Sequence, residues 1–206
     1  MACRRLAVHQ RARPAPRRGE GPVSAEEAEA KTFDERLRYL SRHGGFVALA
    51  VAPRYARPAA ERLASEYGVE RVSVDDRLIA AMREEAVEAG ADWRTVIETD
   101  SAGPGSPDWP LLVTLVKAAV ERLERSLARP DGTLLLEHAG LLARYGQLGL
   151  LERLRDRAGR RDSGLHGAWV LVPSGQMPAV AGQAIPVITP GQWATVPDLW
   201  VRQKVS

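Results

Sequence analysis

The chain has 206 residues, of which 45% are hydrophobic and 27% charged, a composition typical of one soluble globular domain and unlike that of disordered or fibrous proteins. Its single cysteine, Cys3, excludes an internal disulfide and a cysteine-rich zinc site and favours a cytoplasmic location, and the longest apolar run, residues 110–120, is shorter than the ~20 residues that a membrane span needs. The net charge is +3, but residues 1–20 hold six arginines and one glutamate, so the other 186 residues carry −2 and lack the basic excess typical of a nucleic-acid-binding surface.

We expect residues 1–23 to be a disordered, arginine-rich tail and residues 24–206 to form a single α/β domain. The tail lacks the apolar core that a secretory signal has. A transit-like segment, an electrostatic arm and a start codon assigned too early are the alternatives for this segment.

The first half of the domain alternates helical and strand-like patterns. Ser24 and Glu27 have the spacing of a capping box, and apolar residues then recur at helical intervals, which predicts a helix over 24–43. The run FVALAVAP, residues 46–53, is continuously apolar, as expected of a strand buried on both faces. The pattern then predicts a helix over 56–67, a strand over 69–74, and a helix that Asp75 or Asp76 caps and Gly90 ends.

The second half continues the alternation. It predicts a short helix over 92–100, a long helix over 109–128, a strand over 133–137, a helix from 140 that continues or restarts as far as 154, and a strand over 167–174. We expect IPVI, residues 185–188, to be a short fifth strand, followed by a terminal helix that starts at Thr189 and Pro190. Trp193 and Trp200 are expected to anchor this end on its own domain, with a partner surface as the alternative.

Strands that alternate with helices predict a three-layer α/β sandwich with a mainly parallel sheet. Ligands of such sheets bind beyond the carboxyl ends of the strands. In the stretch GTLLLEHAGLLARYG, residues 132–146, Glu137 ends a strand at the position of a Walker B acid. Ser174 ends the next strand, where nucleoside triphosphatases place a sensor residue. These positions favour a degenerate P-loop NTPase-like fold.

The phosphate-binding loop of such a fold is missing from the sequence. The loop after the first strand, APRYARPAAE, has no glycine and contains two prolines, which have no N–H group to offer a phosphate. The chain has three lysines, and none of them follows a glycine. We therefore expect no cofactor and no metal, and we expect Glu137 to pair with an arginine, for which Arg144 is a candidate. The alternative is a site for ATP and Mg²⁺ formed by Arg54, Arg57, Glu137 and Ser174.

The sequence nominates no catalytic residue. The four histidines lack the HxxxH and HExxH spacings of metal sites, and Ser174 lies in VPSGQ rather than in the GxSxG of a hydrolase nucleophile. Enzymatic activity therefore has no motif to support it.

The chain carries a family resemblance in four blocks: GGFVALAVAPRYARPAAERLASEYGVERVSVD, DWRTVIETD, LLLEHAGLLARYGQLGLLERLRDRAG and AWVLVPSGQMPAVAGQAIPVITPGQWATVPDLW. These blocks cover about residues 44–201 and resemble the C-terminal region of the large serine/threonine kinases of the phage growth limitation and related BREX phage-defence systems. The kinase motifs themselves (glycine-rich loop, VAIK, HRD and DFG) are absent from this sequence. The resemblance therefore implies an ATPase-like module without kinase activity.

The leading hypothesis is a non-catalytic α/β interaction module of a phage-defence system, with other phage-defence proteins as partners. The alternative is a nucleotide-binding, NTPase-like domain with a divergent phosphate loop. Neither nucleic acid nor a membrane is expected as a partner of the folded domain.

Overall fold

The computed structural model describes residues 24–174, 177–187 and 189–203, so the predicted tail over 1–23 lies outside the described part. Five parallel strands form the centre of the structure, in the order β2-β3-β4-β1-β7. They are β1 (Gly45–Val51), β2 (Glu70–Ser73), β3 (Arg129–Glu137), β4 (Leu165–Pro173) and β7 (Trp193–Thr195). β1 lies between β4 and β7, and its alternate side chains enter the cores on both faces of the sheet, so its continuous apolar run is buried, as predicted.

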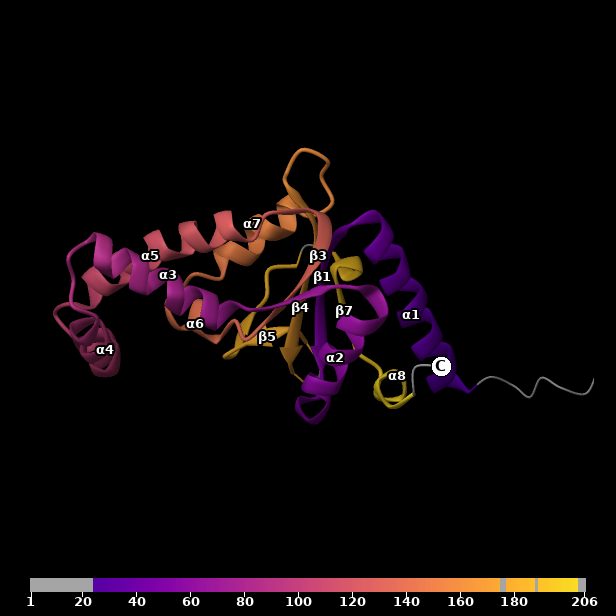
Figure 1. Cartoon of the computed structure of the whole chain (residues 1–206). Helices are drawn as coiled ribbons and strands as arrows, with labels where there is room; N and C mark the ends of the chain where they lie inside the picture. The colour runs from indigo at the N-terminus through magenta and orange to yellow at the C-terminus, as the bar shows by residue number, and fades with distance from the viewer. Residues whose placement is uncertain (1–23, 175–176, 188, 204–206) are drawn as a thin grey trace, which may run out of the picture.

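Helices connect the strands and cover both faces of the sheet (Figure 1). They are α1 (Ala25–His43), α2 (Ala56–Tyr67), α3 (Val74–Glu88), α4 (Trp93–Ala102), α5 (Trp109–Ser126), α6 (Gly140–Arg144), α7 (Gly149–Arg157) and α8 (Asp198–Arg202). Three short 3₁₀ turns, η1 (Pro53–Tyr55), η2 (Gly103–Gly105) and η3 (Pro190–Gln192), and a hairpin of β5 (Ala179–Val180) and β6 (Gln183–Ala184) complete the described elements.

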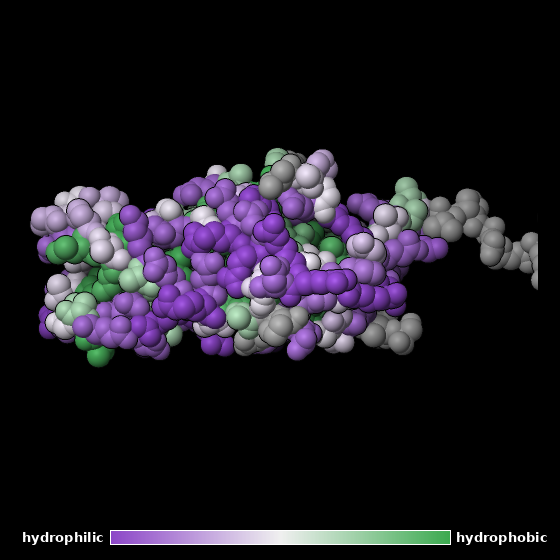
Figure 2. Space-filling view, turned by 90° about the horizontal axis from the view of Figure 1, so that it is seen from above, coloured by the Kyte–Doolittle hydropathy of each residue, from purple (hydrophilic) through white to green (hydrophobic). Residues whose placement is uncertain are grey.

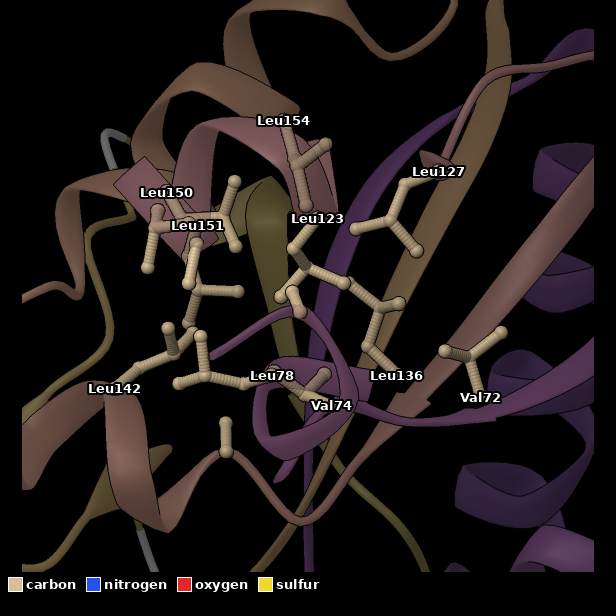
Figure 3. Packing of buried hydrophobic residues seen from close by; sticks show 14 of the residues in the cluster. Val72, Val74, Leu78, Leu123, Leu127, Leu136, Leu142, Leu150, Leu151 and Leu154 are labelled. Atoms are coloured by element: carbon tan, nitrogen blue, oxygen red, sulfur yellow. The ribbon is translucent and has the colours of Figure 1, made fainter. Parts of the chain in front are cut away.

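Alternate residues of each central strand enter two separate cores. In β1, Val47, Leu49 and Val51 pack with α1, α2 and α8, whereas Phe46 and Ala48 pack with α3, α5, α6 and α7. Figure 3 shows the second of these cores, where leucines of several helices meet Val72 and Leu136 of the sheet. The predicted three-layer α/β sandwich with a parallel sheet is thus confirmed.

The end of the described chain differs from the prediction. Residues 185–187 of the predicted fifth strand pair with no other strand; instead Ile185 is buried in the core beside α7. The predicted terminal helix is replaced by η3, which Thr189 and Gln192 cap, and by β7, which pairs with β1. The short apolar run therefore fills the core, while a more polar segment takes the sheet edge. Trp200 does anchor α8, because its ring packs against Phe33 with centroids 5.1 Å apart.

The three helices between β2 and β3 form a helical arm, defined here as α3, α4 and α5, that extends beyond the sheet (Figure 1). Arg122 of α5 ties the arm together by donating to Glu85 and Glu88 of α3 over 2.7 and 2.6 Å. Within the residues that the structure describes, no helix has the length and apolar content to cross a membrane.

Candidate functional site

A cavity of about 580 Å³ lies at the carboxyl edge of the sheet, which is where open α/β sheets bind their ligands. Residues that follow β1, β2 and β3 line it, among them Pro53, Asp75 and His138, and Pro173 contributes the end of β4. This cavity is the candidate site.

Glu137 ends β3 inside the cavity and is buried. Arg71 of the neighbouring strand β2 holds both of its carboxylate oxygens: Nε donates to Oε1 over 2.7 Å and Nη2 to Oε2 over 3.2 Å. In the β2–β3 register Arg71 lies opposite Leu135, so Glu137, two residues further along, is its diagonal neighbour on the same face of the sheet. The expectation of an arginine partner is met, but by a strand neighbour: Arg144 instead donates to Asp100 over 2.9 Å.

Asp75 supports the loop that follows β3. Its Oδ1 accepts the N–H of Leu141 over 2.9 Å, and its own N–H donates to the carbonyl oxygen of His138 over 2.9 Å. His138 has a φ of 52°, a left-handed conformation that residues other than glycine rarely adopt. Burial raises the pKa of the Asp75 carboxyl above its usual value, and the hydrogen bond from the Leu141 amide opposes part of this rise.

The cap of α3 is not the predicted one. Ser73 is the N-cap residue, and its hydroxyl accepts the N–H of Asp76 over 3.4 Å. Asp75 is free of that role because its carboxylate faces α6 rather than the start of its own helix. The serine at the end of β2 therefore caps α3, and the acid two residues later holds the loop that follows β3.

The loop between β1 and α2 offers few N–H groups to an anion. The N–H of Tyr55 donates to Ala52 over 2.8 Å, and the N–H of Ala56 donates to the carbonyl of Pro53. Pro53 in this loop and Pro58 in the first turn of α2 have no N–H at all. A phosphate nest needs several consecutive free amides, and this segment does not provide them.

Two of the four residues predicted to bind nucleotide, Glu137 and Arg57, line the same cavity. The Arg57 side chain is 86% exposed and its Nε donates to Glu61 one helical turn away, over 2.8 Å. Arg57 could reach a ligand in the cavity without disturbing any buried contact.

The other two predicted residues lie outside the lining of the cavity. Arg54 binds Asp198 of α8 over 2.8 Å. The N–H of Ser174 donates to the carbonyl of Val51 over 2.9 Å, and its hydroxyl donates to the carbonyl of Met177. Both are engaged in holding the C-terminal part of the chain, so the structure does not bring the four residues together.

The chain matches no protein-family model and no solved structure. It is 30% identical over 190 residues to Probable kinase PglW of Streptomyces coelicolor, an alignment that covers 86% of the chain. The chain is a PglW-like region. It spans 12% of the length of that relative, and the predicted resemblance to the phage growth limitation kinases is thereby confirmed.

Sequence reasoning missed Arg71 and the role of Asp75 in this PglW-like region. The signal for Arg71 was a basic residue inside the predicted strand over 69–74, a position that is usually apolar when a strand is buried. Its use required the knowledge that β2 and β3 are neighbours. In the part of the PglW-like region that the structure describes, no three His, Cys, Asp or Glu side chains form a group suited to a metal ion.

Proposed function

We propose that the PglW-like region is a non-catalytic α/β interaction module of a phage-defence system of Pgl or BREX type, and that other phage-defence proteins are its partners. Its 30% identity to Probable kinase PglW supports the phage-defence setting. The sequence has none of the kinase motifs, so in this proposal the module contributes contacts rather than phosphoryl transfer.

The Arg71–Glu137 pair carries the proposal that the module is not catalytic. A Walker B-like acid acts by holding Mg²⁺, usually through water, against bound phosphates. Here the guanidinium of Arg71 occupies both carboxylate oxygens of Glu137 and neutralises its charge. Together with the occupied amides of the loop after β1, this arrangement supports a degenerate P-loop-like sheet that has lost its nucleotide.

The exposed apolar side chains support an interaction role. Of the large apolar residues that are exposed in the described chain, Val87, Ile97 and Leu111 lie on the three successive helices of the helical arm. Figure 2 shows apolar side chains gathered at this end of the molecule among hydrophilic ones. Exposed apolar clusters of this kind mark contact surfaces in soluble proteins.

The second candidate function is nucleotide binding at the carboxyl-edge cavity, with ATP and Mg²⁺ as cofactors. The observation that favours it is the placement of Arg57 and Arg71 on one cavity of about 580 Å³, since each guanidinium can donate two parallel hydrogen bonds to phosphate oxygens. In this alternative Arg71 releases Glu137 when the nucleotide enters.

Calorimetric titration of the full chain with ATP and Mg²⁺ separates the two functions. The interaction module predicts no heat of binding at millimolar nucleotide. Micromolar binding that is lost in Glu137→Gln and retained in the matched control Glu98→Gln, which removes an exposed carboxylate on α4, would instead establish the nucleotide site and refute the non-catalytic proposal.

A further inference from the structure

The helical arm contains an apolar groove that is separate from the cavity at the carboxyl edge of the sheet. The groove has a volume of about 590 Å³ and lies between α3, α4 and α5. Val96, Leu112 and Leu115 line it, and Leu111, whose residue surface is 69% exposed, stands on its border. Contact between this apolar lining and water is unfavourable in free energy. Another apolar segment that covers the groove would remove that contact.

Three carboxylates line the groove together with these apolar side chains. Asp92 and Asp108 are the N-cap residues of α4 and α5; both are exposed and both line the groove. Neither carboxylate accepts a hydrogen bond from the first-turn N–H groups of its own helix, so both can bind a basic side chain. Glu85 adds a third acid, although Arg122 already binds it. The groove therefore suits an occupant that combines apolar side chains with basic ones.

The N-terminal part of the sequence contains a segment with this combination. Residues 4–13, RRLAVHQRAR, place Leu6-Ala7-Val8 between two pairs of arginines. This segment belongs to the basic part of a chain whose remaining residues carry a net negative charge, and opposite charges favour encounter and fix the register of binding. The three apolar side chains match the apolar lining, and the flanking arginines match the free acids.

The point at which the segment joins the domain favours the groove of a second copy. Ten residues, 14–23, join the segment to Ser24 and span at most about 36 Å when fully extended. Figure 1 places the start of α1 and the helical arm at opposite ends of the molecule. We propose that residues 4–13 of one copy of this chain dock in the α3–α4–α5 groove of a second copy. This contact deepens the proposed interaction function, on which its biological role rests.

Sedimentation velocity of the full chain at about 10–100 µM and low salt tests the contact. The wild-type chain is expected to self-associate, and the variants Asp92→Asn with Asp108→Asn, Leu111→Ser, and Leu6→Ser with Val8→Ser are each expected to weaken association at least about fivefold. Matched controls are Met177→Ser, an exposed apolar residue outside the helical arm, and Asp162→Asn, an exposed acid in the loop before β4. These controls should associate as the wild type does.

A mixture of two defective chains gives a sharper test. The Leu6→Ser/Val8→Ser chain retains its groove and the Asp92→Asn/Asp108→Asn chain retains its segment, so the two together should form a mixed dimer that neither forms alone. A fluorescent peptide of residues 4–13 should bind the Leu6→Ser/Val8→Ser chain. Its affinity should fall at least fivefold when that chain also carries Asp92→Asn and Asp108→Asn. The same peptide with serine at positions 6 and 8 controls for charge alone.

The outcomes separate this inference from the proposed function. A wild-type chain that stays monomeric over the whole range, groove variants that associate normally, or peptide binding that does not depend on Leu6 and Val8 would each overturn the docking. None of these results affects the ATP titration, and nucleotide binding would overturn the non-catalytic proposal without touching the dimer.

Discussion

At the scale of single residues, Arg71 occupies both carboxylate oxygens that Glu137 would offer to a ligand. Only about a tenth of the Glu137 side chain is exposed, whereas 39% of the Arg71 side chain is. Breaking a buried pair by removing one partner leaves the other charge without compensation, at a cost of about 3–5 kcal/mol when both partners are fully buried. Exposure of Arg71 lowers that cost, because water screens the pair and solvates the guanidinium.

We expect Arg71→Ala to lower the free energy of unfolding by about 1–2 kcal/mol. Adding Glu137→Gln should restore roughly 1 kcal/mol, since the double variant no longer buries an unpaired charge. Urea unfolding of the wild type, Arg71→Ala, Glu137→Gln and the double variant measures both quantities. A loss below about 0.3 kcal/mol in Arg71→Ala would mean that the pair does not constrain Glu137.

Asp75 gives the site a dependence on pH. Its pKa is raised by burial above the ordinary value of 3.8, so the folded chain binds this proton more tightly than the unfolded chain does. The stability contributed by the protonated form is fully present below about pH 4 and is lost as pH rises through the raised pKa. Asp75→Asn keeps an oxygen that accepts the Leu141 N–H and has no charge to bury.

The stability of Asp75→Asn relative to wild type should therefore increase between about pH 4 and pH 7. Urea unfolding at several pH values in that range measures the difference. The control Asp162→Asn, on an exposed loop, should show no such trend. A difference that is flat, or that falls with pH, would contradict the assignment.

At the scale of elements, the junction of α1 and β1 depends on a glycine. Gly44 has φ 76° and ψ −178°, a region that is essentially restricted to glycine. A Cβ there would lie 2.2 Å from the carbonyl oxygen of His166, which precedes the buried part of β4. Since this neighbour is backbone, it has little freedom to move.

Gly44→Ala is expected to cost about 2–4 kcal/mol. Gly90→Ala is the matched control: Gly90 also has a positive φ, 65°, but no atom lies within 4 Å of its added Cβ, so about 1 kcal/mol of backbone strain is its whole effect. Thermal or urea unfolding compares the two. Equal losses would show that the contact with β4 is easily relieved.

The elements also show what the sequence made predictable. Long periodic stretches such as those of α1, α2 and α5 gave helices within two residues of their observed bounds, because the apolar stripe and the caps are local features. Strand order is not local, so Arg71 could not be matched to Glu137 in advance. The exchange between the predicted strand over 185–188 and β7 has the same cause, since three residues gain a strand identity only from pairing with β1.

At the scale of the whole molecule, the basic charge is concentrated in residues 1–20 and the rest of the chain is slightly acidic. We predict that any binding of the full chain to duplex DNA weakens steeply with salt, with a slope set by at most about six phosphate contacts. Replacement of the six arginines in that segment by glutamine should abolish it. Fluorescence anisotropy with a labelled duplex checks this, and DNA binding that survives the replacement would place a nucleic-acid surface on the folded domain.

The short strand β7 has a consequence for truncated forms of the chain. Trp193–Thr195 supplies the hydrogen-bonding neighbour of Ala48–Ala50 on one side of β1. A product that terminates before residue 193 leaves the most apolar strand of the molecule with an uncovered edge, which is a template for pairing with another chain. Ribosomal synthesis passes through that state in every round, so one edge of β1 stays open to aggregation until residues 193–195 have emerged and paired with it.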